Sequence, residues 1–170
     1  MTILSRRGFM AGVALTSATL AGSRAAAAVP PLLLHDPGLA AGRRFAARAT
    51  ALDGESIAIE GERVRCMQAL LARRPSALFG VTRRADALLI GEIAGEAGYR
   101  PVASVRHGAD RMVADCTRDG AAIAALARLA GAGWPEAFAD LALRGVARCK
   151  REPSAVIEPA FSWMLVRRQG

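Results

Sequence analysis

Several residues that could support chemistry follow short apolar segments of the chain. Segments such as Leu32–Leu34 are continuous apolar runs bounded by turn residues, which indicates buried strands of a parallel sheet. The carboxyl ends of parallel strands lie together along one side of the sheet, here called the carboxyl edge. Open sheets bind ligands in the crevice beyond this carboxyl edge. The residues that follow the four expected strands are His35, Asp36, Glu60, Thr82, Arg83, His107 and Asp110.

The two histidines of the protein, His35 and His107, both fall at this expected edge. Two histidines with nearby carboxylates could bind a divalent metal or work as an acid–base pair. Structural roles also account for the carboxylates, because Asp36 can cap the following helix and Asp110 can belong to a turn. We therefore expect no metal site. The catalytic candidates are His35, Asp36 and His107, and the ligand-binding candidates are Glu60, Thr82, Arg83 and Asp110.

The third expected helix, Arg83–Ala97, has two unusual features. Arg83 and Arg84 stand at its start, where the helix dipole disfavours cations by about 0.3–1 kcal/mol. A bound anion held by these arginines and the free N–H groups would offset that cost, and solvated arginines are the alternative. Gly91 and Gly95 lie one turn apart, and we expect them to let the helix sit close to the sheet.

The sequence lacks the local motifs of several enzyme and cofactor classes. It contains no G-x-S-x-G, no Walker lysine loop, and no G-x-G-x-x-G after the first expected strand. Its three cysteines form no C-x-x-C, so iron–sulfur, structural zinc and covalent haem sites lack their ligand patterns. We therefore expect no cofactor.

The cysteines suggest at most one disulfide and one reactive thiol. In an oxidising compartment Cys116 and Cys149 are the preferred pair because both lie in the C-terminal half, and the other two pairings stay open. Cys66, near the start of an expected helix, could be reactive.

The order of the expected elements indicates a single α/β domain. Apolar or alternating runs predict strands at Leu32–Leu34, Ser56–Glu60, Ala77–Val81 and Pro101–Arg106, with helical patterns between them. This alternation predicts three layers around a mostly parallel four-stranded sheet with crossover helices.

The C-terminal third follows a different pattern. Two helices are expected at Gly120–Ala130 and Trp134–Arg144, and an antiparallel edge strand is expected at Ala160–Val166. Arg111–Cys116 could pair back on the fourth strand or begin a helix, and we favour the strand.

The N-terminus has the features of an export signal. It carries the pattern S-R-R-x-F, made of Ser5, Arg6, Arg7 and Phe9. This pattern, followed at once by a modest apolar stretch, resembles a twin-arginine (Tat) signal peptide. Small residues ending at Ala28 fit the A-x-A cleavage rule, so we expect a signal at 1–28 and a mature domain at 29–170. The apolar stretch is too short and too rich in Thr, Ser and Gly to span a membrane stably.

The resemblance implies a bacterial protein that is moved to the periplasm, already folded, by the Tat translocase. Such cargo often carries a cofactor or leaves with a partner that carries one. Because cofactor motifs are absent, we expect a binding or accessory protein of an exported system, such as a redox system, with another exported protein as partner. The alternative is a small α/β enzyme or ligand binder that uses the crevice around His35 and His107.

The chain is basic, with a formal net charge of +8. Residues 1–28 hold three arginines and no acid, so the mature domain keeps a net charge of +5. All basic residues except Lys150 are arginines, which a GC-rich genome would explain; an anionic partner or a membrane surface is the other explanation. Nucleic acid is not expected, because basic and aromatic residues do not interleave.

Overall fold

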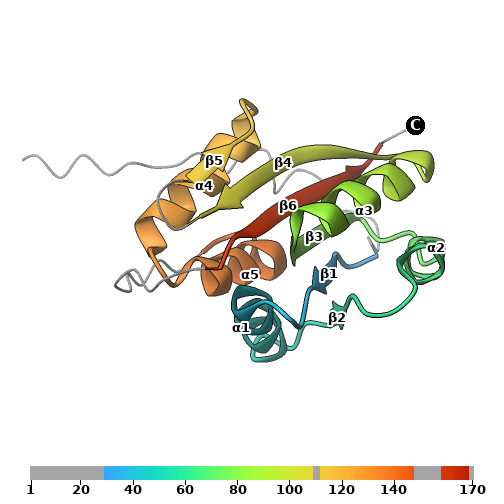
Figure 1. Ribbon diagram of the computed structural model, residues 1–170, viewed down its shortest axis with the longest axis horizontal. Coiled ribbons are helices and arrows are strands. Elements are labelled where there is room, and N and C mark those ends of the chain that lie inside the picture. Colours follow the sequence, from blue (N-terminus) through green and yellow to red (C-terminus); the bar gives the residue numbers. More distant parts are fainter. Residues whose placement is uncertain (1–28, 109–111, 148–157, 169–170) are drawn as a thin grey trace, which may run out of the picture.

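A single mixed sheet with helices on both faces forms the framework of the protein (Figure 1). The computed structural model describes residues 29–108, 112–147 and 158–168. The elements are β1 (Leu32–His35), α1 (Ala40–Thr50), β2 (Ser56–Ala58), α2 (Arg63–Ala72), β3 (Ala77–Thr82), α3 (Arg84–Glu96), β4 (Tyr99–His107), β5 (Met112–Ala114), α4 (Arg118–Ala130), α5 (Trp134–Arg144) and β6 (Ala160–Arg167). The expected α/β class is thus confirmed. Within the residues described, no helix combines the length and the apolar character needed to cross a membrane.

In the described part of the chain, the sheet has six strands in the order β2-β1-β3-β6-β4-β5. β1 pairs in parallel with β2 and with β3, whereas β6 is antiparallel to both of its neighbours and β5 is antiparallel to β4. The expectation of a mostly parallel four-stranded sheet was therefore wrong. The expectation that the segment after β4 pairs back on it as a strand is confirmed by β5.

The C-terminal strand β6 lies at the centre of the sheet, between β3 and β4, and not at its edge as expected. A crossover from β3 through α3 requires only that β4 belong to the same sheet, so it leaves room for a strand between them. β6 suits that place because it is apolar on both sides: Trp163 and Leu165 enter one core and Met164 enters the other. An edge strand would have left these side chains exposed.

Each face of the sheet carries its own hydrophobic core. On one face α1, α4 and α5 cover the sheet, and the rings of Phe45 and Phe79 each lie within 6 Å of Phe138. On the other face α2 and α3 cover β1, β3 and β6, with Met67 and Ile90 buried between them. This arrangement gives the three layers that the sequence predicted.

Two ion pairs join α1 to α5 on the first face. Arg44 donates to both carboxylate oxygens of Glu136, and Arg48 donates twice to one oxygen of Asp140. Asp140 is only 3% exposed, and its ion pair with Arg48 offsets the cost of burying the carboxylate.

The glycines of β3 and α3 have opposite surroundings. Gly80 lies opposite Trp163 in the β3–β6 register, and a Cβ at Gly80 would fall 2.0 Å from the indole. A Cβ at Gly91 or Gly95 would meet nothing within 4 Å. The expectation that Gly91 and Gly95 allow close packing of the helix on the sheet was wrong, because both face open space.

We predict opposite stability changes for two Gly→Ala variants. Gly80→Ala should lower the free energy of unfolding by about 1–3 kcal/mol, because the methyl group overpacks a buried indole. Gly91→Ala should raise it by up to about 1 kcal/mol, because it removes a glycine from an exposed helix interior without a clash. Urea unfolding of both variants tests this, and equal effects would show that Gly80 is not a contact site for Trp163.

Candidate functional site

β1 and β3 end side by side at the place where open sheets bind ligands. They are parallel neighbours, and the helices that follow them, α1 and α3, lie on opposite faces of the sheet. Neighbouring strands whose connections leave to opposite faces mark a topological switch point. Asp36 follows β1 and Arg83 follows β3, so the structure brings these two predicted site residues together.

Asp36 forms the centre of this edge. Its carboxylate is buried, with Oδ1 accepting a hydrogen bond of 2.8 Å from the Gly38 N–H and Oδ2 lying 2.8 Å from a guanidinium nitrogen of Arg83. Oδ2 accepts no well-aligned hydrogen bond within the described residues. Asp36 does not cap α1 directly, because the turn at 37–39 places Leu39 at the N-cap.

Arg83 forms ion pairs with carboxylates of the protein itself. Besides Asp36, the carboxylate of Glu158 lies 3.9 Å from this guanidinium, which is half exposed. The two carboxylates offset the unfavourable position of a cation at the start of α3. An external anion would therefore compete with two carboxylates of the protein for Arg83.

A second ion pair, which the sequence analysis missed, links α2 to α3 nearby. Arg63 donates to Asp86 at 2.8 Å and to the backbone oxygen of Gly61 at 2.6 Å. The hydrogen bond to Asp86, followed by the charge of that carboxylate, raises the pKa of Arg63. An acidic residue in the first turn of a helix is a recognisable signal. Arg63, which lies 23 residues earlier, could not be recognised from the sequence as the partner of Asp86.

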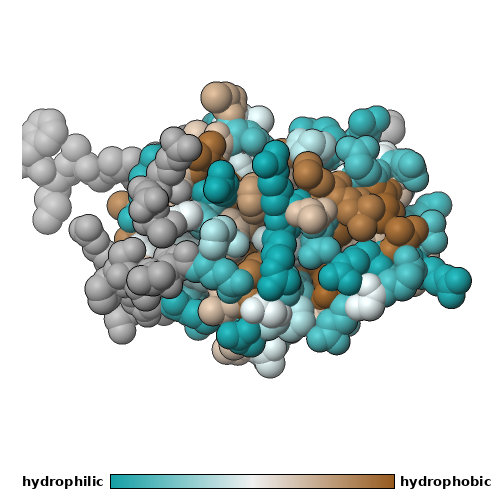
Figure 2. Space-filling view, viewed as in Figure 1, coloured by the Kyte–Doolittle hydropathy of each residue, from teal (hydrophilic) through white to brown (hydrophobic). Residues whose placement is uncertain are grey.

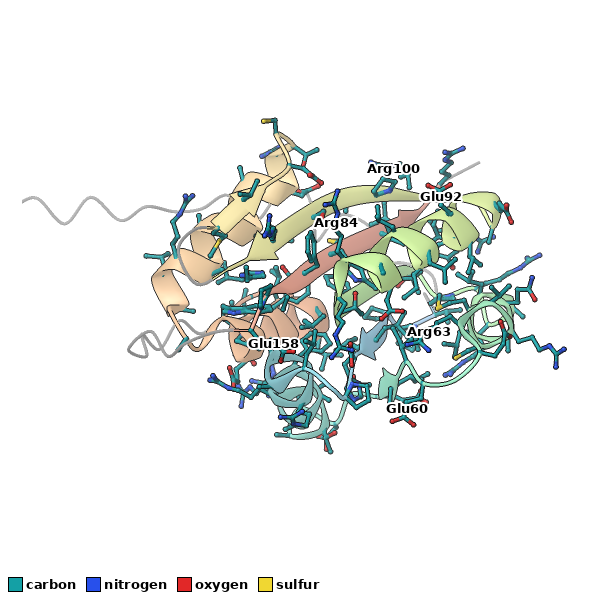
Figure 3. The ribbon with its side chains drawn as sticks, viewed as in Figure 1. Glu60, Arg63, Arg84, Glu92, Arg100 and Glu158 are labelled. Atoms are coloured by element: carbon teal, nitrogen blue, oxygen red, sulfur yellow. The ribbon has the colours of Figure 1, made fainter. Side chains whose placement is uncertain are left out.

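His35 is the half-exposed histidine of the pair. Its Nδ1 lies 2.9 Å from Oγ of Ser56 on β2. Burial, the largest effect, lowers the pKa of His35, although the charges of Asp36 and Glu60 act in the opposite direction. Glu60 itself is exposed and points away from the sheet (Figure 3). His35 is therefore neutral at neutral pH and can reach solvent.

His107, in contrast, is a core residue with 2% of its surface exposed. Its ring stacks on the indole of Trp134 at a centroid distance of 3.6 Å, and Nε2 lies 2.8 Å from Oγ of Ser162. That distance would suit a nucleophile and its base, but Ser162 is fully buried. No described side chain orients Nδ1, which has no hydrogen-bond partner. Burial lowers the pKa of His107 to about 3.

The two histidines do not share a site. β3 and β6 lie between β1 and β4, so three strand spacings of about 4.8 Å separate them, or roughly 14 Å. The acid–base or metal-binding pair considered from the sequence is therefore not assembled. Among the residues described, no group of three His, Cys, Asp or Glu side chains is placed to hold a metal ion.

The remaining predicted residues have structural roles or cannot be placed. Thr82 is buried, and its Oγ1 accepts a hydrogen bond of 3.0 Å from Nε1 of Trp163. Cys66 is half-buried in α2, and Cys116 is exposed. The predicted residues that lie outside the described parts are Arg6, Arg7, Phe9, Ala28, Asp110 and Cys149. The disulfide between Cys116 and Cys149 therefore stays a prediction.

Comparison with known proteins gives no relative from which a function could be transferred. No family model, no curated protein and no solved structure matches the chain.

We predict that His107 makes the fold sensitive to acid. Its pKa in the folded state, about 3, lies below its unfolded value near 6.5, so the unfolded state binds the proton first as the pH falls. Stability should fall by roughly 1.4 kcal/mol per pH unit through this window, from about pH 6 downward. Urea midpoints between pH 7 and pH 4 measure this slope.

His107→Phe keeps a ring against Trp134 but cannot titrate, so it should show a shallower slope than the wild type. His35→Gln should leave most of the slope in place, since His35 is less buried. If His107→Phe keeps the full slope, carboxylates and not His107 cause the acid sensitivity.

Proposed function

We propose that this protein is an exported binding or accessory protein that works in the periplasm beside another exported protein. The N-terminal S-R-R-x-F pattern supports export, with a redox system as the first class of partner to examine. At the carboxyl ends of β1 and β3, Asp36 pairs with Arg83, and nearby Arg63 of α2 pairs with Asp86 of α3. Because these charges are already paired, they are poorly suited to catalysis, and we place the binding role elsewhere on the molecule.

The observation that carries the proposal is a part of the sheet that its own helices leave open. On the side of α2 and α3, the buried core takes Tyr99 from β4 and no residue from β5. Further along, Arg106 of β4 pairs in register with Val113 of β5, and both are exposed on this side. Among the described residues, the helical layer is thus incomplete over β4 and β5.

The neighbouring side of α3 is also open. Leu88 is 59% exposed, and a Cβ at Gly91 would meet no atom of another described residue within 4 Å. Residues at spacings of four and seven lie on one side of a helix, so Arg84 shares this side with them. Figure 3 shows Arg84 extending from the first turn of α3 in the direction of β4. We call Arg84, Leu88, Gly91, Arg106 and Val113 the α3/β5 surface.

The charges on the α3/β5 surface define the partner it would fit. Within the described residues, no carboxylate lies within ion-pair distance of Arg84 or Arg106. Exposed Leu88 and Val113 supply apolar contact area, and Gly91 allows another backbone to approach closely. The complementary partner is an acidic, amphipathic segment of a second protein, which would complete the layer beside α3.

A second candidate function rests on His35. It is neutral, half-exposed, and lies next to Asp36 and within the field of Glu60 at the switch point. A small ligand binder or α/β enzyme could use these groups. Unlike the α3/β5 surface, this edge has its strongest charges already paired.

We predict that charge reversal on the α3/β5 surface weakens the complex. Native mass spectrometry of the protein recovered from the periplasm should show it bound to a second polypeptide. Arg84→Glu combined with Arg106→Glu should weaken that complex at least about tenfold, or 1.4 kcal/mol. The matched control, Arg118→Glu with Arg128→Glu, makes the same charge change on exposed positions of α4 and should keep the complex.

The other outcomes of the same experiment also decide between the functions. A bare monomer, or equal loss in both double variants, contradicts a role for the α3/β5 surface. A single chain with extra mass would instead favour a small ligand at the His35 edge.

We also predict that export depends on Arg6 and Arg7. Replacing both with lysine keeps the positive charge but removes the paired arginines of the Tat pattern, so the protein should remain in the cytoplasm at full length. Cell fractionation and the intact mass measure this. For the wild type, the expected periplasmic chain begins at Val29. Unchanged export of the double variant would refute the Tat route.

A further inference from the structure

A groove of about 460 Å³ lies at the opposite end of the strands from Asp36 and His35. The ends of α2 and α3 form its sides, and the start of β4 and the end of β6 contribute Tyr99 and Arg167. Figure 2 shows hydrophobic side chains gathered on the surface between α2 and α3. The volume falls within the range of small-molecule sites in proteins.

The floor of the groove is apolar. Leu71 and Tyr99 are buried and Ile93 is half-buried, and all three line the groove. The hydroxyl of Tyr99 donates a hydrogen bond of 2.6 Å to the backbone oxygen of Pro75. The hydroxyl group therefore has a hydrogen-bond partner inside the protein, and Tyr99 contributes its apolar ring to the lining of the groove.

Arg74 stands on the rim in an unusual backbone conformation. Its φ is +52°, and its N–H donates to the backbone oxygen of Leu71 in the turn that ends α2. Glycine is the residue that this left-handed position normally takes, because a Cβ is disfavoured there. The neighbouring Arg73 pairs with Glu55, whereas no described carboxylate lies within ion-pair distance of Arg74. Packing and ion pairing within the described residues do not account for an arginine here.

Arg167 brings a second guanidinium group to the same groove. It lies opposite Tyr99 in the β4–β6 register, so the two side chains leave the same face of the sheet. Burial raises the pKa of Tyr99, and the charge of Arg167 acts in the opposite direction. Arg167, like Arg74, has no carboxylate within ion-pair distance among the described residues. Glu96 is the one acid among the described residues that line the groove, so two arginines outnumber it there.

We propose that this groove binds a small amphipathic anion, in which a carboxylate head is attached to an apolar body. Arg74 and Arg167 hold the head, and the body lies on Leu71, Ile93 and Tyr99. The site is distinct from the α3/β5 surface and does not depend on the partner proposed for it. The two sites can therefore be tested separately.

Isothermal titration of the mature protein with decanoate tests the proposal. We expect saturable binding at one site. The matched probe decyltrimethylammonium carries the opposite charge on a similar body, and butyrate carries the head with little body; both should bind at least tenfold more weakly. No decanoate binding, binding at many equivalent sites, or equal binding of the cationic probe would overturn the proposal.

Substitutions then locate the site. Arg74→Gly and Arg167→Gln should each weaken decanoate binding at least fivefold, while Arg128→Gln on α4 should bind like the wild type. Arg74→Gly also removes the disfavoured left-handed side chain, so its melting temperature should not fall, and lost affinity cannot be attributed to unfolding. Wild-type affinity in both Arg74→Gly and Arg167→Gln would place the anion elsewhere and refute the site.

Discussion

The insertion of β6 between β3 and β4 is the constraint on which the rest of the structure depends. Trp163 occupies the space that the missing side chain of Gly80 leaves on β3, and its indole nitrogen donates to Thr82. Next to it, Ser162 bonds His107 on the other face. A single C-terminal strand therefore joins the parallel half of the sheet to the antiparallel half, and both cores close over it.

Ion pairs link the segments that follow the parallel strands at their carboxyl ends. Burying a carboxylate costs free energy unless a cation pairs with it. Asp36 pairs with Arg83, and Asp86 pairs with Arg63. These pairs tie the loop after β1 to the start of α3, and α2 to α3. Two of these four residues, Asp36 and Arg83, are site candidates of the sequence, and here they stabilise the fold. His35 is half-exposed beside them.

The two faces of the sheet differ in how completely they are closed. Three helices cover one face, where Arg44 and Arg48 are paired with acids of α5. As far as the chain is described, two helices cover the other face, and they leave β4 and β5 partly exposed. The α3/β5 surface and the groove between α2 and α3 both lie on this second side. Each combines apolar area with arginines that have no acidic partner in the described part of the chain. Recognition is therefore best sought on this side of the molecule.

The sequence alone determined the local elements, because apolar periodicity and the Gly and Pro breakers act over a few residues. The expected strands, the helices between them and the return strand β5 all form. Only the tertiary structure decided the strand order, because pairing depends on contacts between distant segments. Asp36 and Arg83 meet because β1 and β3 are neighbours, whereas His35 and His107 are parted because β6 enters between β3 and β4.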